Sequence, residues 1–233
     1  QMCIRDRLHS GEHTKMVSRT YGRMAIQDGR RNLDREYPDH PEDILWQTID
    51  PDELWVLDKL ILSRKMGYVC GPTGMDVPKA DYYIVRPCVN AMGLGLGAQK
   101  LWIEKQTIDL PLGYFWCEWF EGRHYSVDYK FGNQVLCVEG FKSENTFTKW
   151  DKWLKIHKHI PAPDIILNTF INKEHLNCEY IGDKLIEVHL RQNTDFDDQI
   201  TEFIPVWEGQ DTTPPVGYTS VSYTHLRAHE TSL

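Results

Sequence analysis

The segment LNCEYIGDKLIEVHLRQN at residues 176–193 constrains the fold most strongly, because it predicts two strands joined by a tight turn. The strands cover residues 176–181 and 184–190, with turn-forming Gly182 and Asp183 between them. In the second strand apolar and polar side chains alternate, which places them on opposite faces of a sheet. The apolar face carries Ile186, Val188 and Leu190, and the polar face carries Glu187, His189 and Arg191.

This polar face has the composition of a metal site. Glu179 on the first strand supplies a second carboxylate beside Glu187, His189 and Arg191. Two carboxylates with an imidazole and an arginine suit a hard cation, typically Mg²⁺, that bridges phosphates. A surface hairpin with a charged face explains the same residues, and this segment alone does not separate the two interpretations.

The spacing of the two glutamates tests the metal hypothesis. Glu179 and Glu187 are eight positions apart, so a strict two-residue turn would pair Glu187 with Cys178. The two carboxylates share a face only if the turn has an odd number of residues or a bulge is present. The metal hypothesis therefore predicts a three-residue or bulged turn.

Both ends of the chain are set apart from the fold. Residues 1–7 contain MCIRDR and residues 221–233 contain VSYTHLRAHET, which resemble translated transposon-type sequencing adapters and indicate a metagenomic reading frame. Between them we expect a polar arm or truncated domain at 8–48, a folded domain at 49–210, and a Pro-rich tail at 211–220.

Deleting residues 1–7 and 221–233 should leave the melting temperature unchanged, because adapter residues have no reason to pack against the domain. Thermal unfolding of the full and trimmed chains measures this. Surface changes rarely exceed about 0.5 kcal/mol, so a loss above about 1 kcal/mol in the free energy of unfolding would contradict the assignment.

The composition of the chain limits the classes of partner that it is expected to bind. The net charge is −8, or about −9 without the two ends, and no basic run is present, which argues against nucleic acid as the main partner. Five cysteines remain outside the ends, without a CxxC spacing, as is typical of reduced thiols in a cytoplasmic protein. No apolar run has the length of a membrane span, so no membrane partner is expected.

Periodicity predicts the other elements. A helix is expected from the Asp50 cap to Gly67, with Lys59 outside its buried stripe of Leu54, Leu57, Leu60 and Ile61. A second helix is expected at 144–157. Strands that form an antiparallel sheet are expected at 82–87, 101–104, 114–120, 124–129 and 135–138.

Two segments have the features of a nucleotide site. Gly93, Gly95 and Gly97 follow a strand that carries Arg86, and such a loop lets backbone N–H groups approach a phosphate. A mobile hairpin loop is the alternative. The apolar run at 115–120 could be a hinge that contacts adenine, with Glu118 at a ribose hydroxyl. An ordinary core strand is the alternative there.

Four segments in order resemble an ATP-grasp enzyme. They are LDKLILSRKMGYVCGP, YYIVRPCVNAMGLGLGA, FWCEWFEGRHYSVDY and NCEYIGDKLIEVHLR, and they span residues 58–193. The resemblance implies an α+β ATP-grasp fold of two small lobes, each with sheet and helix, and a nucleotide between them. Relative to that family's pattern, we expect the N-terminal domain to be absent or truncated and the segment between lid and hinge to be short.

The resemblance also implies roles for individual residues. Lys59 and Arg86 would contact phosphates, Arg86 in place of the usual lysine. Arg86 and Arg191 would be the catalytic residues, and Arg191 would meet the reacting carboxyl group or its acyl phosphate. The remaining matches are the lid (Gly93, Gly95, Gly97), the hinge (Glu118, Trp119, Phe120), a nucleotide contact (His124), the metal carboxylates (Glu179, Glu187), and His189 at the usual metal-binding Asn, with Asn193 as a substitute ligand.

The implied activity is ligation driven by ATP and Mg²⁺, with Mn²⁺ as an alternative metal. ATP would phosphorylate a small-molecule or peptide carboxylate, and an amine or similar nucleophile would displace phosphate from the acyl phosphate. The protein would mainly position groups and neutralise charge. His189 and the missing domain motivate a second hypothesis, a non-catalytic nucleotide-binding or interaction protein. The ligase hypothesis predicts a glycine loop that is exposed, poorly packed and closes over the face that carries Arg86 and the two glutamates. A buried loop would favour the second hypothesis.

Overall fold

A computed structural model describes residues 49–89, 95, 97–142, 147, 150–193 and 195–205. The two adapter-like ends, the polar arm, the Pro-rich tail and Gly93 lie outside the described residues. None of the described helices is long and apolar enough to cross a membrane.

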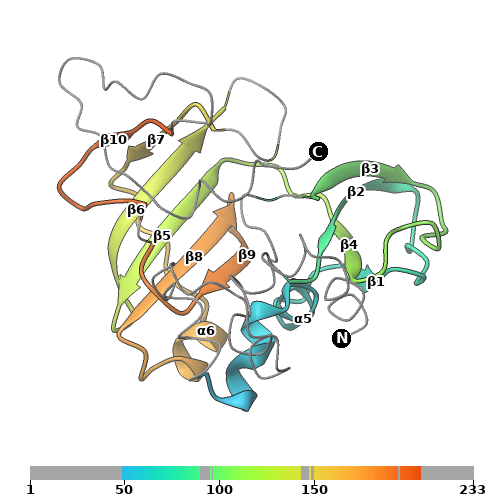
Figure 1. Cartoon of the computed structure of the whole chain (residues 1–233), viewed down its shortest axis with the longest axis horizontal. Coiled ribbons are helices and arrows are strands. Elements are labelled where there is room, and N and C mark those ends of the chain that lie inside the picture. The colour runs from blue at the N-terminus through green and yellow to red at the C-terminus, as the bar shows by residue number, and fades with distance from the viewer. Residues whose placement is uncertain are drawn as a thin grey trace, which may run out of the picture.

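Two antiparallel sheets form the framework (Figure 1). The small sheet has the order β1 (Cys70–Pro72), β4 (Tyr114–Glu118), β2 (Asp81–Pro87) and β3 (Gln99–Ile103). The large sheet has the order β10 (Glu202–Phe203), β7 (Lys152–Lys155), β6 (Asn133–Phe141), β5 (His124–Lys130), β8 (His175–Ile181) and β9 (Lys184–His189). The expected α+β class is confirmed, and each of the seven predicted strands has a counterpart, whereas β1, β7 and β10 were not predicted. The five strands expected between residues 82 and 138 divide between the two sheets, as the two-lobe expectation implies.

Each sheet has a hydrophobic core of its own. One face of the large sheet packs Val127, Cys178 and Leu185 against the helix α6 (Asp164–Thr169) and the 3-10 helix η1 (Pro51–Leu57). The small sheet encloses a second cluster around Tyr83, Val85 and Trp116. Helix α5 (Lys59–Lys65) contacts β9 of the large sheet and both β1 and β4 of the small one. The helix that carries Lys59 therefore joins the two lobes.

The expected single helix from Asp50 to Gly67 is wrong, because the chain breaks at Asp58. Asp50 caps η1, whereas the Asp58 carboxylate accepts hydrogen bonds from the N–H groups of Leu60 and Ile61 at 2.9 and 3.0 Å and starts α5. The break changes the helical phase. Leu54 and Ile61 are 38% and 39% exposed, whereas Lys59 is only 7% exposed. The predicted buried stripe is therefore wrong at Leu54 and Ile61, and Lys59 lies on the buried side.

The expected helix at 144–157 is also wrong, because residues 152–155 form strand β7. Trp153 lies opposite Gly140 of β6, and a Cβ atom at Gly140 would lie 2.6 Å from Trp150 and 2.9 Å from Trp153. The missing side chain of Gly140 thus leaves the space that the two indole rings occupy. Apolar residues at three- and four-residue intervals fit a helix, but pairing with β6 overrides this local pattern.

Candidate functional site

The hairpin of β8 and β9 contains the bulge that the metal hypothesis requires. Tyr180 pairs with Leu185 next to the two-residue turn, but Glu179 then pairs with Glu187, so Ile186 is the extra residue. The predicted bulge is confirmed, and it lies in strand β9 rather than in the turn. It places the two glutamates directly opposite each other on one face of the sheet.

The bulge also joins the two sheets. The carbonyl of Ile186 accepts a hydrogen bond from Nη2 of Arg86 in β2 at 3.0 Å. Arg86 is 9% exposed and its guanidinium lies 5.3 Å from the ring centroid of Phe115. Burial lowers the pKa of Arg86, and the charges of Glu187 and Glu179 oppose this effect. Arg86 is therefore a fixed cation from the small sheet beside both carboxylates of the large sheet.

Lys59 completes the contact from α5. Its Nζ lies 3.0 Å from Oε2 of Glu187, with side-chain exposures of only 8% and 13%. Its backbone N–H donates to the carbonyl of Cys88 at 2.7 Å, which anchors the start of α5 beside the end of β2. The other oxygen of Glu187 lies 3.5 Å from Nε2 of His189. Lys59, predicted from its place in the early helix, is thus brought to the carboxylate pair by the helix break.

Glu179 is paired from the opposite side. Nε2 of His124 lies 3.2 Å from its Oε2. Burial would raise the pKa of Glu179, but the His124 hydrogen bond and charge, together with His189 and Lys59, lower it below the usual value. Like charges directly opposite each other in a sheet repel, and the Lys59 and Arg86 cations and the hydrogen bond from His124 offset this repulsion. We call the set of Lys59, Arg86, His124, Glu179, Glu187 and His189 the charge cluster.

A buried polar network adjoins the charge cluster on the same sheet face. Asn177 donates from Nδ2 to Oγ of Ser126 at 2.8 Å and to Oδ1 of Asp128 at 2.9 Å. Burial raises the pKa of Asp128, while hydrogen bonds from Asn193 and Asn177 oppose this. The sequence analysis missed this network, although polar residues alternate with Tyr and Val at 124–129 and indicate its face.

Two predicted site residues, Asn193 and Arg191, make hydrogen bonds outside the glutamate pair. Asn193 donates from its backbone N–H to Oδ1 of Asp128 at 3.0 Å and from Nδ2 to Oγ of Ser126 at 3.3 Å. Nη1 of Arg191 donates to the carbonyl of Gln192 at 3.1 Å. A metal ion would bind Asn193 through Oδ1, and this atom already accepts a hydrogen bond from the N–H of Asp195 at 2.9 Å.

The hinge residues are held by the small-sheet side. Glu118 accepts from the N–H of Val69 at 2.9 Å and donates its own N–H to the Val69 carbonyl at 2.8 Å. The Trp119 ring lies 4.1 Å from Nζ of Lys100, and Phe120 packs edge-on against Tyr68 at 4.7 Å. The carboxylate of Glu118 is thus bonded to backbone, and Lys100 is an additional cation at the hinge that the sequence analysis did not identify.

The glycine loop meets the expectation only in part. Gly95 is exposed and has φ +66°, a conformation that favours glycine. Gly97 has φ +81°, and a Cβ atom there would lie 2.5 Å from the Tyr114 hydroxyl, so its small size is needed for packing. The loop is therefore exposed at Gly95 and packed at Gly97, while Gly93 lies outside the described residues.

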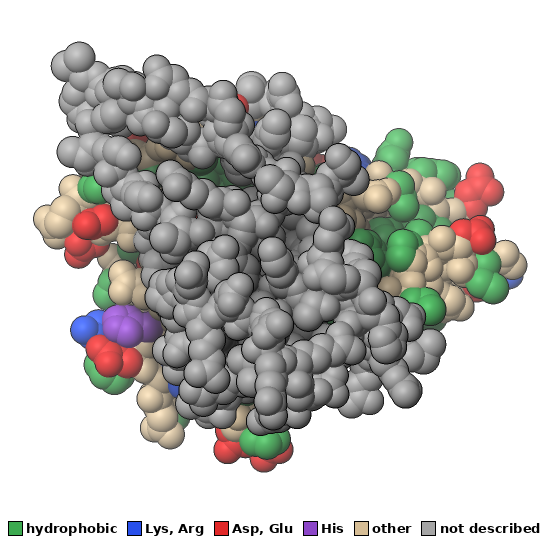
Figure 2. Space-filling model, in the orientation of Figure 1, with side chains coloured by type: hydrophobic (Ala, Val, Ile, Leu, Met, Phe, Trp, Pro, Cys, Tyr) green, Lys and Arg blue, Asp and Glu red, His purple; other side chains and the backbone are tan. Residues whose placement is uncertain are grey.

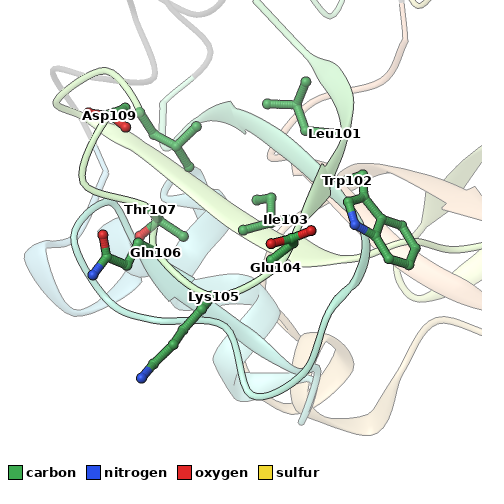
Figure 3. A pocket seen from close by; sticks show the side chains of 9 residues that line it. Leu101, Trp102, Ile103, Glu104, Lys105, Gln106, Thr107 and Asp109 are labelled. Carbon is green, nitrogen blue, oxygen red and sulfur yellow. The ribbon is translucent and has the colours of Figure 1, made fainter.

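A pocket of about 280 Å³ lies elsewhere, beside β3 and the turn that follows it (Figure 3). It shares no lining residue with the charge cluster. Hydrophobic side chains are visible on the small-sheet side of the molecule in Figure 2. Met75, Trp102, Ile108 and Leu112, from the segments of this sheet and its turns, are all more than half exposed. This pocket is therefore separate from the candidate site.

The charge cluster fits a hard cation in donor type. Mg²⁺ prefers oxygen ligands, and the bulge holds two carboxylates side by side. In the part of the chain that the structure describes, no three His, Cys, Asp or Glu side chains converge closely enough to hold a metal ion as they stand. Glu187 is instead paired with Lys59 and His189. Metal binding would therefore require Lys59 to move away from Glu187.

Comparisons with known proteins add little to this description. No family model and no curated protein matches the sequence. Similar solved structures include an L-amino acid ligase from Bacillus licheniformis (12% identity, TM-score 0.39, covering 58% of this chain and 40% of that one) and the ATP-grasp ligase PsnB with its minimal precursor (12%, 0.38, 60% and 52%). An Archaeoglobus fulgidus protein assigned to the ATP-grasp superfamily is 16% identical, with a TM-score of 0.37, and the match covers 60% of this chain and 46% of that one. The chain thus spans about half the length of these structures, and similarity at this level assigns neither family nor activity.

Proposed function

We propose that the protein is a ligase of the ATP-grasp type that uses ATP and Mg²⁺ to join a carboxylate to an amine or a similar nucleophile. The observation that carries the proposal is the charge cluster. It brings Glu179 and Glu187 from one sheet together with Arg86 from the other sheet and Lys59 from the helix between them. Two carboxylates can hold a metal ion, and two fixed cations can hold phosphate oxygens. The combination therefore suits a metal-bound polyphosphate better than it suits a metal ion or a phosphate by itself.

Each member of the charge cluster has a role in this proposal. Glu179 and Glu187 would hold Mg²⁺, which would neutralise phosphate charge when bound. Lys59 and Arg86 would contact phosphate oxygens, and Arg86 would do so with little reorganisation because the Ile186 carbonyl already fixes its guanidinium. Arg191 would steady the carboxyl group of a small-molecule or peptide substrate.

The nucleotide would lie against the hinge. Trp119 and Phe120 offer apolar surface, and His124 offers a nitrogen next to Glu179. Lys100, which lies over the Trp119 ring, adds a cation at this end. The hinge backbone would contact adenine, and the contact of Glu118 with a ribose hydroxyl would use Oε2, because Oε1 accepts a hydrogen bond from the N–H of Val69.

A turnover assay tests the proposal. The purified chain is incubated with ATP, Mg²⁺ and pooled carboxylates and amines, and ADP release is compared with that in the absence of either pool. Release that requires both pools supports a ligase. Tight binding of Mg·ATP without any release would support the alternative, a nucleotide-binding protein without catalysis, and the absence of both would contradict the nucleotide site.

Replacing Gly95 by valine should lower ATP turnover at least about tenfold while the protein stays folded. A β-branched residue disfavours the left-handed conformation of Gly95 by about 1–2 kcal/mol, and its Cβ would lie 3.1 Å from the Phe147 carbonyl. The residue is exposed, so the core is not affected. Turnover and the melting temperature are measured in parallel. Gly74→Val is the control, because Gly74 has φ +89° in a different loop.

A further inference from the structure

Two cysteines face each other in the small sheet. Cys70 of β1 is the register partner of Cys117 in β4, and both are free thiols. Cys117 precedes the hinge residue Glu118, and its side chain is buried, whereas Cys70 is half-buried. The two sulfurs therefore belong to neighbouring strands at the point where the small sheet meets the hinge.

The hydrogen-bond pattern determines how close the two side chains come. The N–H of Glu118 donates to the carbonyl of Val69 at 2.8 Å, one position beyond the cysteine pair on each strand. Cys70 and Cys117 therefore form a non-hydrogen-bonded pair, in which Cα atoms lie about 4.5 Å apart and side chains are closest. Disulfides span Cα distances of about 4.4–6.8 Å, so this pair can close with little movement of the backbone.

We propose that Cys70 and Cys117 form an oxidisable dithiol, which a low-molecular-weight disulfide such as oxidised glutathione converts to a cross-strand disulfide. The Cys70 thiolate attacks one glutathione sulfur and releases the other glutathione as a thiolate. The Cys117 thiolate then attacks the Cys70 sulfur of the mixed disulfide and releases the second glutathione. The protein loses two electrons and two protons, and one oxidised glutathione becomes two reduced ones.

The surroundings set the order and the rate of these steps. Cys70 is the accessible thiol and reacts first, while buried Cys117 resolves the adduct. Burial raises the pKa of both thiols, to about 12 for Cys117, whereas Arg64 beside Cys70 and Arg86 beside Cys117 oppose this. Only the thiolate reacts, so the exchange is slow at neutral pH and faster in mildly alkaline solution.

The disulfide would close a long loop. Residues 70–117 contain β2 with Arg86, the glycine loop and β3. The bond would therefore tie β1 to β4, which are the first and the last strand of the small sheet in chain order. Closing a loop of this length restricts the unfolded chain. The oxidised protein should therefore melt several degrees higher than the reduced one. This inference rests on the register of the small sheet and is independent of the proposed ligase activity.

The chain offers a matched control in its other buried thiols. Cys137 and Cys178 both pair with Val127, from opposite sides of β5. They are therefore two strand spacings apart, about 9.6 Å, which exceeds the span of a disulfide. Oxidation should link Cys70 to Cys117 and leave Cys137 and Cys178 as thiols.

The test uses the full chain with oxidised glutathione at about pH 8.5, because the thiolate fraction of both thiols is larger there than at neutral pH. Thiols are then alkylated, and peptide mass spectrometry identifies the cross-link. Wild type should lose the Cys70 and Cys117 thiols together, without retaining glutathione, and should melt at a higher temperature. Cys117→Ser should instead keep glutathione on Cys70, and Cys70→Ser should leave Cys117 as a free thiol. The proposal is overturned if wild type retains glutathione on Cys70, or if both thiols stay alkylatable.

Discussion

Replacing Glu187 by glutamine should weaken Mg·ATP binding by about 100-fold or more, which corresponds to about 2.7 kcal/mol. The substitution keeps the size of the side chain and removes one of the two carboxylates that the bulge at Ile186 places side by side. Mg²⁺ binds carboxylate oxygens much more strongly than amide oxygens because its attraction to the ligand charge dominates. Isothermal titration calorimetry with Mg·ATP measures the affinity of wild type and variant.

The free energy of unfolding should change less than the binding energy in this variant. The amide oxygen of glutamine can still accept the hydrogen bond from Lys59, which lies 3.0 Å from Glu187. The variant also removes the repulsion between Glu187 and Glu179, and Glu179 keeps a negative charge near Lys59. Asp183→Asn is the matched control, because it removes a carboxylate from the same hairpin at a side chain that is 85% exposed. An unchanged Mg·ATP affinity in Glu187→Gln would show that this carboxylate does not hold the metal.

Replacing Lys59 by methionine should lower the free energy of unfolding by about 3 kcal/mol and also weaken ATP binding. Lys59 and Glu187 form a largely buried ion pair, and removing one partner leaves the other charge without compensation. Glu187 would then face Glu179 with less opposing charge, and like charges directly opposite each other repel. Chemical denaturation gives the loss of stability, and calorimetry gives the loss of ATP affinity.

The effect of added Mg²⁺ on the melting temperature shows whether Lys59 has only a structural role or also lies beside a metal site. In wild type the ion must displace Lys59 from Glu187, whereas in Lys59→Met the two carboxylates are free of this competitor. Mg²⁺ should therefore raise the melting temperature of the variant more than that of wild type. Lys65→Met, an exposed lysine of the same helix, should show neither the loss nor the rescue. Equal responses of Lys59→Met and wild type would argue against a metal at the glutamate pair.

The accuracy of the sequence analysis depended on how local each signal was. The hairpin of β8 and β9 followed from alternation and a Gly-Asp turn, and its observed bounds differ from the expected ones by one residue at each outer end. Asp50 was identified correctly as a cap because a cap involves only the next few residues. Asp58 was missed as a second cap, so Lys59 was predicted to lie outside the buried face of the helix although it is buried.

Strand β7 shows the opposite case. Its tryptophans recur at a spacing that fits a helix, and nothing within the segment indicates that Gly140 leaves space for them on β6. The polar network of Ser126, Asp128 and Asn177 was missed for a related reason. Its members lie on two strands that are about 50 positions apart in the sequence, as in the hydrogen bond from Asn177 to Asp128, and only the sheet register brings them together.

The sequence by itself determined the α+β class, seven of the ten described strands, and the types of charged residue that a phosphate and metal site would need. The tertiary structure alone decided that Glu179 lies opposite Glu187, that Lys59 is buried against Glu187, and that Arg86 reaches the Ile186 carbonyl across 100 positions of sequence. The physical reason is range. Periodicity and capping depend on neighbours within one turn or one strand, whereas a bulge and a contact between lobes depend on packing between segments far apart in the chain.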